Sequence, residues 1–214
     1  MCEIRLLFPV HMRTFFQDDT WQSGLEEIRV RVGQPIEFCY GSDNCYLIGK
    51  EKEQMFCNEK DYRRWEKDLY HASEADLREM LNYISNYSLY AYKEEIKQGY
   101  ITIEGGHRVG VAGQTVLVDG KIAGISPITF LNIRIAHEKC GCARKILPLI
   151  RQRDSIYNTL ILSMPGAGKT TLLRDSIRAL SNGEAYGIRL KVCVVDERSE
   201  IAASFHGVPQ NDMG

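Results

Sequence analysis

Upstream of residue 140, alternating apolar and polar positions predict a series of short strands. Residues 25–32 alternate partly at period two and run into Gly33-Gln-Pro35, which is typical of a strand that ends in a turn. Gly41-Ser-Asp-Asn44 predicts one hairpin, and Asp119-Gly120 between apolar neighbours predicts a second, tighter one. The predicted strands of this region are 25–32, 36–40, 45–48, 100–103, 108–118, 121–125 and 128–135.

An amphipathic helix is predicted between Ser73 and Tyr87. Ser73 and Asp76 have the spacing of a capping box, with Asp in the place of the usual Glu. The apolar side chains that recur at helical spacing are Leu77, Met80, Leu81, Ile84 and Tyr87. Strands and helix together predict a mixed α+β domain.

The pattern changes near residue 155, where polar, hairpin-like segments give way to an apolar run at 158–163. A glycine-rich turn follows, and then a helical pattern that stops at Asn182-Gly183. A second apolar run at 190–195 predicts another strand, and a connecting helix is expected around 143–151. We therefore expect an N-terminal α+β domain over residues 1–154 and the β-turn-α-β start of an α/β domain over residues 155–214.

Composition narrows the classes of partner and compartment. The 214 residues are 44% hydrophobic and 26% charged, which suits a globular protein with a core. A formal net charge of -1 removes any whole-chain electrostatic argument for nucleic acid, so no nucleic-acid partner is expected. Seven scattered cysteines, an odd number, favour a reduced cytoplasmic protein. No apolar stretch is long enough to span a membrane, so a membrane connection is expected to run through a partner.

The turn after 158–163 has the pattern of a phosphate-binding (Walker A) loop between a strand and a helix. Gly166 and Gly168 would let backbone N–H groups curl around a phosphate at the helix N-terminus. Lys169 would add a positive charge and Thr170 a hydroxyl for Mg²⁺, so ATP and Mg²⁺ are the expected cofactors. The residues expected to contact nucleotide are Ser163, Met164, Pro165, Gly166, Ala167, Gly168, Lys169, Thr170 and Thr171.

One departure from the usual pattern and one alternative interpretation concern this loop. Ser163 stands where the usual pattern opens with Gly, a modest departure that leaves the glycines, Lys169 and Thr170 in place. The alternative interpretation is an ordinary glycine-rich turn between a strand and a helix that happens to be followed by Lys and Thr.

A pair of carboxylates follows the run 190–195. Asp196 and Glu197 would reach the edge of an α/β sheet where phosphates bind, and either could hold the Mg²⁺ shell or orient an attacking water. Only one helix separates this pair from Lys169. The spacing therefore indicates that the pair lies on the strand next to the loop strand, and not on the usual Walker B strand. The alternative is a solvated strand end whose charges pair with Arg198.

Weaker patterns concern cysteine, histidine and arginine. Cys140-Gly-Cys142 with His137 nearby is compatible with zinc, but a turn before a helix is the preferred interpretation. Arg108 and Arg134 could reach a nucleotide phosphate across a subunit contact, although exposed strand arginines are the simpler alternative. The isolated histidines, interpreted as surface or core residues, are His71, His107 and His206.

The chain resembles the stage III sporulation protein AA family, which is similar to the ATPases of type II and type IV secretion systems. The resemblance rests most specifically on Val195-Asp-Glu-Arg-Ser-Glu-Ile-Ala202 and on 207–212, together with the loop and the first turns of the following helix, 163–175. Upstream, the segments that agree with the family's N-terminal domain are 25–35, 105–113 and 131–136.

The resemblance implies a RecA-like P-loop ATPase domain and a motor ATPase that forms a hexameric ring. It places such a protein in the mother cell, associated with membrane channel proteins that link mother cell and forespore during endospore formation. Lys169, Glu197 and Asp196 would be its catalytic residues. Members of the family continue past 207–212 into a strand that bears Walker B, so we expect these 214 residues to bind nucleotide and the full-length parent to hydrolyse it.

Two other functions fit the same residues. A small-substrate kinase or nucleotide-dependent regulator would use Asp196 and Glu197 as its only acidic pair. A scaffold that assembles without hydrolysis would use nucleotide, if bound, only to order a ring.

Overall fold

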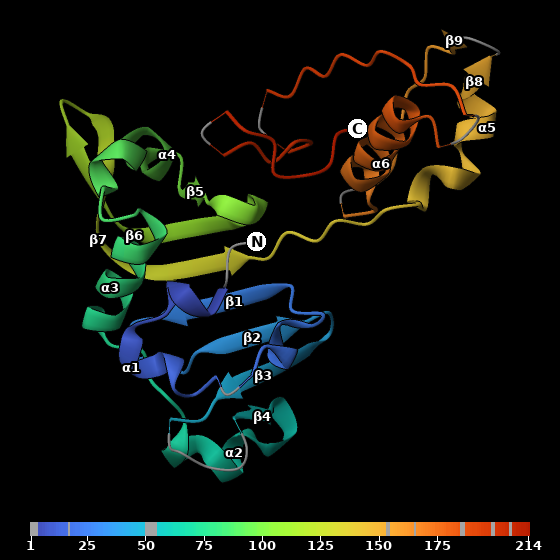
Figure 1. Ribbon diagram of the computed structural model, residues 1–214. Coiled ribbons are helices and arrows are strands. Elements are labelled where there is room, and N and C mark those ends of the chain that lie inside the picture. The colour runs from blue at the N-terminus through green and yellow to red at the C-terminus, as the bar shows by residue number, and fades with distance from the viewer. Residues whose placement is uncertain are drawn as a thin grey trace. The chain divides into compact units, whose positions relative to one another are not determined.

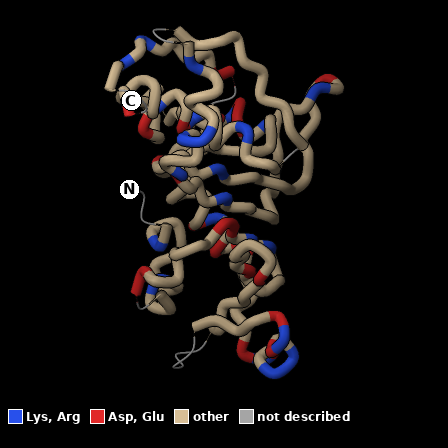
Figure 2. Tube along the Cα trace, turned by 90° about the vertical axis from the view of Figure 1, so that its right-hand side faces the viewer, with Lys and Arg blue, Asp and Glu red and all other residues tan. Residues whose placement is uncertain are grey.

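A computed structural model of the chain describes residues 4–16, 18–49, 55–152, 155–164, 166–184, 187–197, 200–205 and 207–214. Pro165, Arg198 and His206, which the sequence analysis singled out, lie outside these ranges. The chain divides into two compact units, Met1–Ala136 and His137–Gly214, both drawn in Figure 1. Lysines and arginines are interspersed with aspartates and glutamates along the trace (Figure 2), as the near-zero net charge suggests.

The first unit is built on a seven-stranded antiparallel sheet of order β4-β3-β2-β1-β7-β6-β5. Its strands are β1 Glu27–Arg31, β2 Glu37–Tyr40, β3 Asp43–Leu47, β4 Phe56–Asn58, β5 Tyr100–Thr102, β6 Arg108–Val118 and β7 Lys121–Arg134. Its helices are α1 Val10–Arg13, α2 Tyr62–Trp65, α3 Glu74–Ile84 and α4 Lys93–Lys97. The predicted α+β character of this region is confirmed.

Alternation along the strands places an apolar row against the helices. Ile28 and Val30 of β1 are fully buried, as are Leu131 and Ile133 of β7 beside them. From the helices, α3 contributes Leu77, Met80, Leu81 and Ile84 to this core. The Ser73 hydroxyl accepts the Asp76 N–H at 3.1 Å and the Asp76 carboxylate accepts the Ser73 N–H at 2.8 Å, so the predicted capping box is confirmed.

The β6–β7 hairpin also follows its prediction at the turn. Asp119 and Gly120 both adopt positive φ, 52° and 74°, as a type I′ turn requires. The two runs predicted at 121–125 and 128–135 form one strand instead, because the register of β6 shifts around Gly113 and accommodates Pro127. A Cβ at Gly113 would overlap the carbonyl oxygen of Pro127, so only glycine fits there.

The second unit contains α5 Leu147–Ile150, the short pair β8 Arg151–Gln152 and β9 Ser155–Ile156, and α6 Lys169–Asn182. A 3₁₀ turn, Cys142–Lys145, precedes α5. Ala143 and Leu147 from these turns pack against Ala179 and Leu180 of α6. The second unit begins at His137, whereas the sequence predicted a boundary at 154/155.

The two strands predicted for the second unit are not formed within the described residues, which is a correction to the sequence analysis. The runs 158–163 and 190–195 are without secondary structure, and the ladder partners that strands require are missing from the described part of the unit. Several of their apolar side chains are open to solvent, with Leu160 85%, Leu162 87% and Val195 89% exposed, whereas Ile161, Leu190 and Val194 are half-buried. Among the described residues, no helix combines the length and apolar character needed to cross a membrane.

Candidate functional site

The glycine-rich loop is shaped by two left-handed residues. Gly168, at φ 84°, is the N-cap of α6, and Gly166 adopts φ 77°. A Cβ at either position would meet nothing within 4 Å, so glycine is required by the backbone conformation and not by lack of space. Gly183, at φ 73°, ends the helix at the predicted place.

The start of α6 offers donors to an anion. Within the described part of the chain, no side chain caps this N-terminus, and the first N–H groups of a helix lack partners within it. Lys169 lies over the loop, where its Nζ donates to the carbonyl oxygens of Ser163 at 3.2 Å and Met164 at 2.9 Å. The Lys169 ammonium and the backbone N–H groups at the start of α6 therefore both belong to this loop.

Of the remaining loop residues, most are open to solvent. Ser163, Met164, Gly166, Ala167 and Gly168 are exposed. Lys169, Thr170 and Thr171 are half-buried in the first turn of α6. The described part of the loop is thus open to solvent, and the first turn of α6 is partly exposed beside it.

A cleft of about 440 Å³ brings the predicted carboxylates to the start of the helix. Lys169 and Thr170 line it from α6, and Asp196 and Glu197 line it from the segment after the second apolar run. Glu200 lines the same cleft, although the sequence analysis assigned it no role. Its position three residues after Glu197 was the signal in the sequence that could have found it.

Asp196 and Glu197 differ in their surroundings. Glu197 is exposed. Asp196 is half-buried, and its carboxylate accepts the backbone N–H groups of Glu200, Ile201 and Ala202, each at 2.9 Å. The two carboxylates therefore do not have equivalent freedom to contact a ligand.

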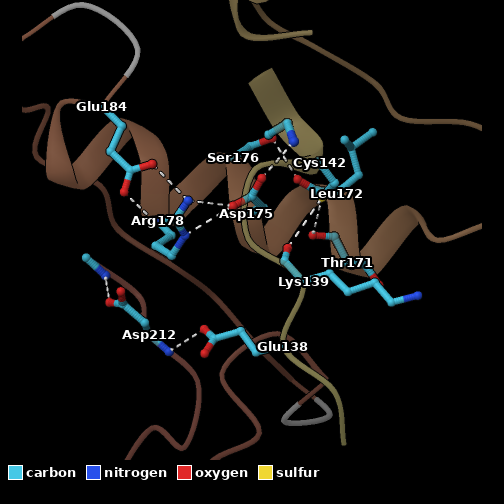
Figure 3. A network of polar contacts seen from close by, with 12 residues as sticks. Glu138, Lys139, Cys142, Thr171, Leu172, Asp175, Ser176, Arg178, Glu184 and Asp212 are labelled. Atoms are coloured by element: carbon cyan, nitrogen blue, oxygen red, sulfur yellow. Dashed lines mark hydrogen bonds and ion pairs between the residues drawn. The ribbon is translucent and has the colours of Figure 1, made fainter. Parts of the chain in front are cut away.

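A buried ionic network holds α6 in the second unit, and Figure 3 shows Arg178 between Asp175 and Glu184. Arg178 donates to Asp175 through Nε at 3.1 Å and Nη2 at 2.8 Å, and its guanidinium also pairs with Glu184. Asp175 accepts the Ala143 N–H at 2.7 Å, which ties the 3₁₀ turn to α6. The helix that follows the loop is thus held by the Asp175–Arg178 ion pair and by the hydrogen bond from the Ala143 N–H.

Burial alone would raise the pKa of the Asp175 carboxyl. The N–H groups of Ala143 and Gly141 and the Arg178 guanidinium outweigh burial, so the pKa lies below its ordinary value. Contacts with Glu184 and then Asp175 raise the pKa of Arg178. Both side chains are therefore charged at neutral pH.

Acid is expected to destabilise the second unit through Asp175. Because folding lowers the pKa of this carboxyl below 3.8, its contribution to stability is complete at neutral pH and is lost as the pH falls through the folded pKa. Urea titrations between about pH 2 and pH 6, followed by the NMR amide signals of α6, would measure this loss. Asp175→Asn should lose less stability over the same range; an equal loss would contradict the assignment.

The weaker predictions have mixed outcomes. Cys140 and Cys142 are exposed, and among the described residues no group of three His, Cys, Asp or Glu side chains could hold a metal ion. His107 is buried and its Nδ1 accepts the Ala136 N–H at 2.9 Å, which is a structural role.

The two strand arginines are neighbours on the sheet. Arg108 and Arg134 are cross-strand partners on β6 and β7, and Arg108 lies 4.4 Å from the centre of the Tyr100 ring. Arg134 is exposed. Their reach to a nucleotide stays a prediction.

Fold and site define a protein of two units, an antiparallel α+β unit and a unit whose glycine-rich loop opens a helix beside acidic side chains. The chain belongs to the family described as sporulation stage III, protein AA, whose model matches residues 2–214. It is 38% identical over 216 residues to stage III sporulation protein AA of Bacillus subtilis (strain 168), and the match covers 100% of this chain and 63% of that protein. The chain thus spans 63% of the length of this relative.

Among solved structures, the ATPase DotB of Legionella pneumophila is similar to this chain with a TM-score of 0.41 and 18% identity. The similarity covers 81% of this chain and 42% of that one.

Proposed function

We propose that this chain binds ATP together with Mg²⁺ through residues 163–171, as the nucleotide-binding part of a motor ATPase. One observation carries the proposal: Lys169 and Thr170, at the uncapped start of α6, share a cleft with the carboxylates of Glu197 and Glu200. Donors for phosphate and acceptors for a hydrated cation are the two halves of a nucleotide site.

The donor set fits a nucleoside triphosphate. Gly166 and Gly168 give the loop its left-handed backbone, and no described side chain caps the first N–H groups of α6. Lys169 would exchange its two loop carbonyls for phosphate oxygens, and the Thr170 hydroxyl would contact Mg²⁺. Bound Mg²⁺ would supply positive charge against the charge that develops on the phosphates.

Hydrolysis is proposed for the full-length protein, with Glu197 orienting the attacking water. Its side chain is exposed, which leaves it free to act on a water. The front part of a RecA-like domain is proposed for 155–214, where runs 158–163 and 190–195 would become strands once neighbouring strands pair with them.

Family membership supports the cellular part of the proposal. We expect a mother-cell protein, cytoplasmic or peripheral at the membrane through channel proteins, that assembles as a homo-oligomeric ring, a hexamer by the secretion-ATPase resemblance. Arg108 and Arg134 are proposed to lie near a neighbour's nucleotide in such a ring.

Glu197→Gln in the full-length protein should slow ATP turnover about 100-fold or more, because a positioned base contributes that much. ATP affinity should change by less than about threefold, since the phosphate donors are intact. Steady-state hydrolysis and ATP titration measure the two quantities. Glu59→Gln, an exposed glutamate of the first unit, is the matched control.

The outcomes separate the alternatives. Unchanged turnover in Glu197→Gln would move the catalytic carboxylate elsewhere. ATP binding without hydrolysis in the full-length protein would favour the scaffold, and turnover that requires an added small acceptor would favour the kinase.

A further inference from the structure

The turn 200–202 is held from both sides of its backbone. On the N–H side, the Asp196 carboxylate accepts three backbone donors: Oδ1 from Glu200, and Oδ2 from Ile201 and Ala202, all at 2.9 Å. On the carbonyl side, Arg174 donates to the oxygens of Ile201 through Nε and of Glu200 through Nη2, both at 2.7 Å.

A second carbonyl-side contact comes from further along the chain. The Asn211 side-chain amide donates to the Ile201 oxygen at 3.0 Å, and the Ala202 oxygen accepts the N–H groups of Gln210 and Asn211. The turn therefore has charged partners on both edges and a backbone partner at its end. Together these hydrogen bonds hold the backbone of the turn 200–202 in one conformation.

These contacts limit what Asp196 can do. Both of its oxygens are engaged, and three N–H donors take most of the acceptor positions of one carboxylate. If Asp196 turned to a cation or a water, the three N–H groups would lose a charged acceptor. A carboxylate with backbone donors converging on it is suited to fixing a loop.

Glu200 is in the opposite position. Its backbone is fixed by Asp196 and Arg174, while its side chain is exposed and lines the cleft with Lys169 and Thr170. Arg174 lies one turn after Thr170 on α6. The helix that begins at the loop therefore also donates a hydrogen bond to the backbone of Glu200.

We propose that Asp196 is a positioning residue that fixes the turn 200–202 together with Arg174, and that Glu200 supplies the carboxylate facing the Mg²⁺-bound phosphates in the cleft. The part concerning Glu200 rests on the proposed function. The part concerning Asp196 rests on the hydrogen bonds alone and can be tested without nucleotide.

The first test measures hydrogen exchange at the amides of Glu200, Ile201 and Ala202 by NMR in the nucleotide-free chain. Asp196→Asn should speed their exchange about tenfold, because an amide offers one acceptor oxygen in place of two charged ones. Arg174→Lys, which keeps the charge but not the paired donors, should give a smaller increase. Asp119→Asn, at a hairpin turn of the first unit, is the control and should change nothing. Unchanged exchange in Asp196→Asn would overturn the positioning role.

The second test is a double-mutant cycle on the factor by which Mg²⁺ raises ATP affinity. Glu200→Gln should reduce this factor about tenfold, since a charged contact near the cation is lost. Asp196→Asn should reduce it by no more than that, and the double variant should match Glu200→Gln alone, because Asp196 acts only through Glu200. Losses that multiply would make Asp196 a direct contact and overturn the proposal.

The two tests distinguish this inference from the proposed function. Failure of the unmodified chain to bind ATP would refute the proposed function and, with it, the role of Glu200. Faster amide exchange at 200–202 in Asp196→Asn would still establish Asp196 as the residue that holds the turn.

Discussion

Lys169→Ala is expected to weaken ATP·Mg²⁺ binding by about 100-fold or more. The ammonium would contact two phosphate oxygens, and each charged hydrogen bond contributes roughly 1.5–3 kcal/mol. In the structure, the same ammonium donates to the carbonyl oxygens of Ser163 and Met164, so it already lies over the loop. Isothermal titration of ATP with Mg²⁺ measures the loss.

Two further variants separate charge from loop shape. Lys169→Met keeps a long aliphatic stem and removes the charge, so it should weaken binding as much as Lys169→Ala does. Lys191→Ala removes an exposed lysine that does not line the cleft and should leave affinity unchanged. Affinity in Lys169→Met equal to that of the unmodified chain would refute the phosphate-loop assignment.

Asp175→Ala is expected to destabilise the second unit by about 3–5 kcal/mol, the cost of removing one partner from a buried ion pair. Arg178, only 8% exposed at its side chain, would keep Glu184 but lose Asp175, and the Ala143 N–H would lose its acceptor. Hydrogen exchange at the α6 amides reports this unit. Both tryptophans, Trp21 and Trp65, lie in the first unit, so tryptophan fluorescence is an internal control that should not change.

Glu184→Gln is the matched comparison for this effect. Glu184 pairs with the same arginine, but its side chain is 41% exposed, so its loss should cost about 1 kcal/mol or less. A cost for Asp175→Ala as small as that for Glu184→Gln would show that the buried network does not anchor α6.

Features set by near neighbours in the chain were predictable. The Ser73–Asp76 capping box, the Asp119-Gly120 turn and the stop of α6 at Gly183 each depend on a few consecutive residues. Backbone preferences and local hydrogen bonds decide such features before distant segments meet.

Features that need distant partners were not predictable to the same degree. The apolar runs 158–163 and 190–195 have the composition of buried strands, yet a strand also needs a neighbour, and none pairs with them among the described residues. A connecting helix was expected around 143–151, in the first domain. The structure has a 3₁₀ turn and the short helix α5 there, and Ala143 and Leu147 pack on α6 in the second unit.

The sequence by itself determined β1, β2, β3, β5, β6, β7 and α3 in their order along the first unit, the glycine-rich loop at the start of α6 and the presence of carboxylates downstream, because each depends on local periodicity or on a contiguous motif. The short elements α1, α2, α4 and β4 were not predicted. Only the tertiary structure decided how those carboxylates differ. Asp175 and Asp196 are ordinary acidic residues in the sequence, but folding decides what each holds. The Ala143 N–H, 32 residues away, donates to Asp175, whereas Asp196 accepts N–H groups of the nearby turn 200–202, whose carbonyl side Arg174 of α6 holds. Charge and hydrogen-bond capacity are properties of a residue, whereas the partners that use them are brought together by folding.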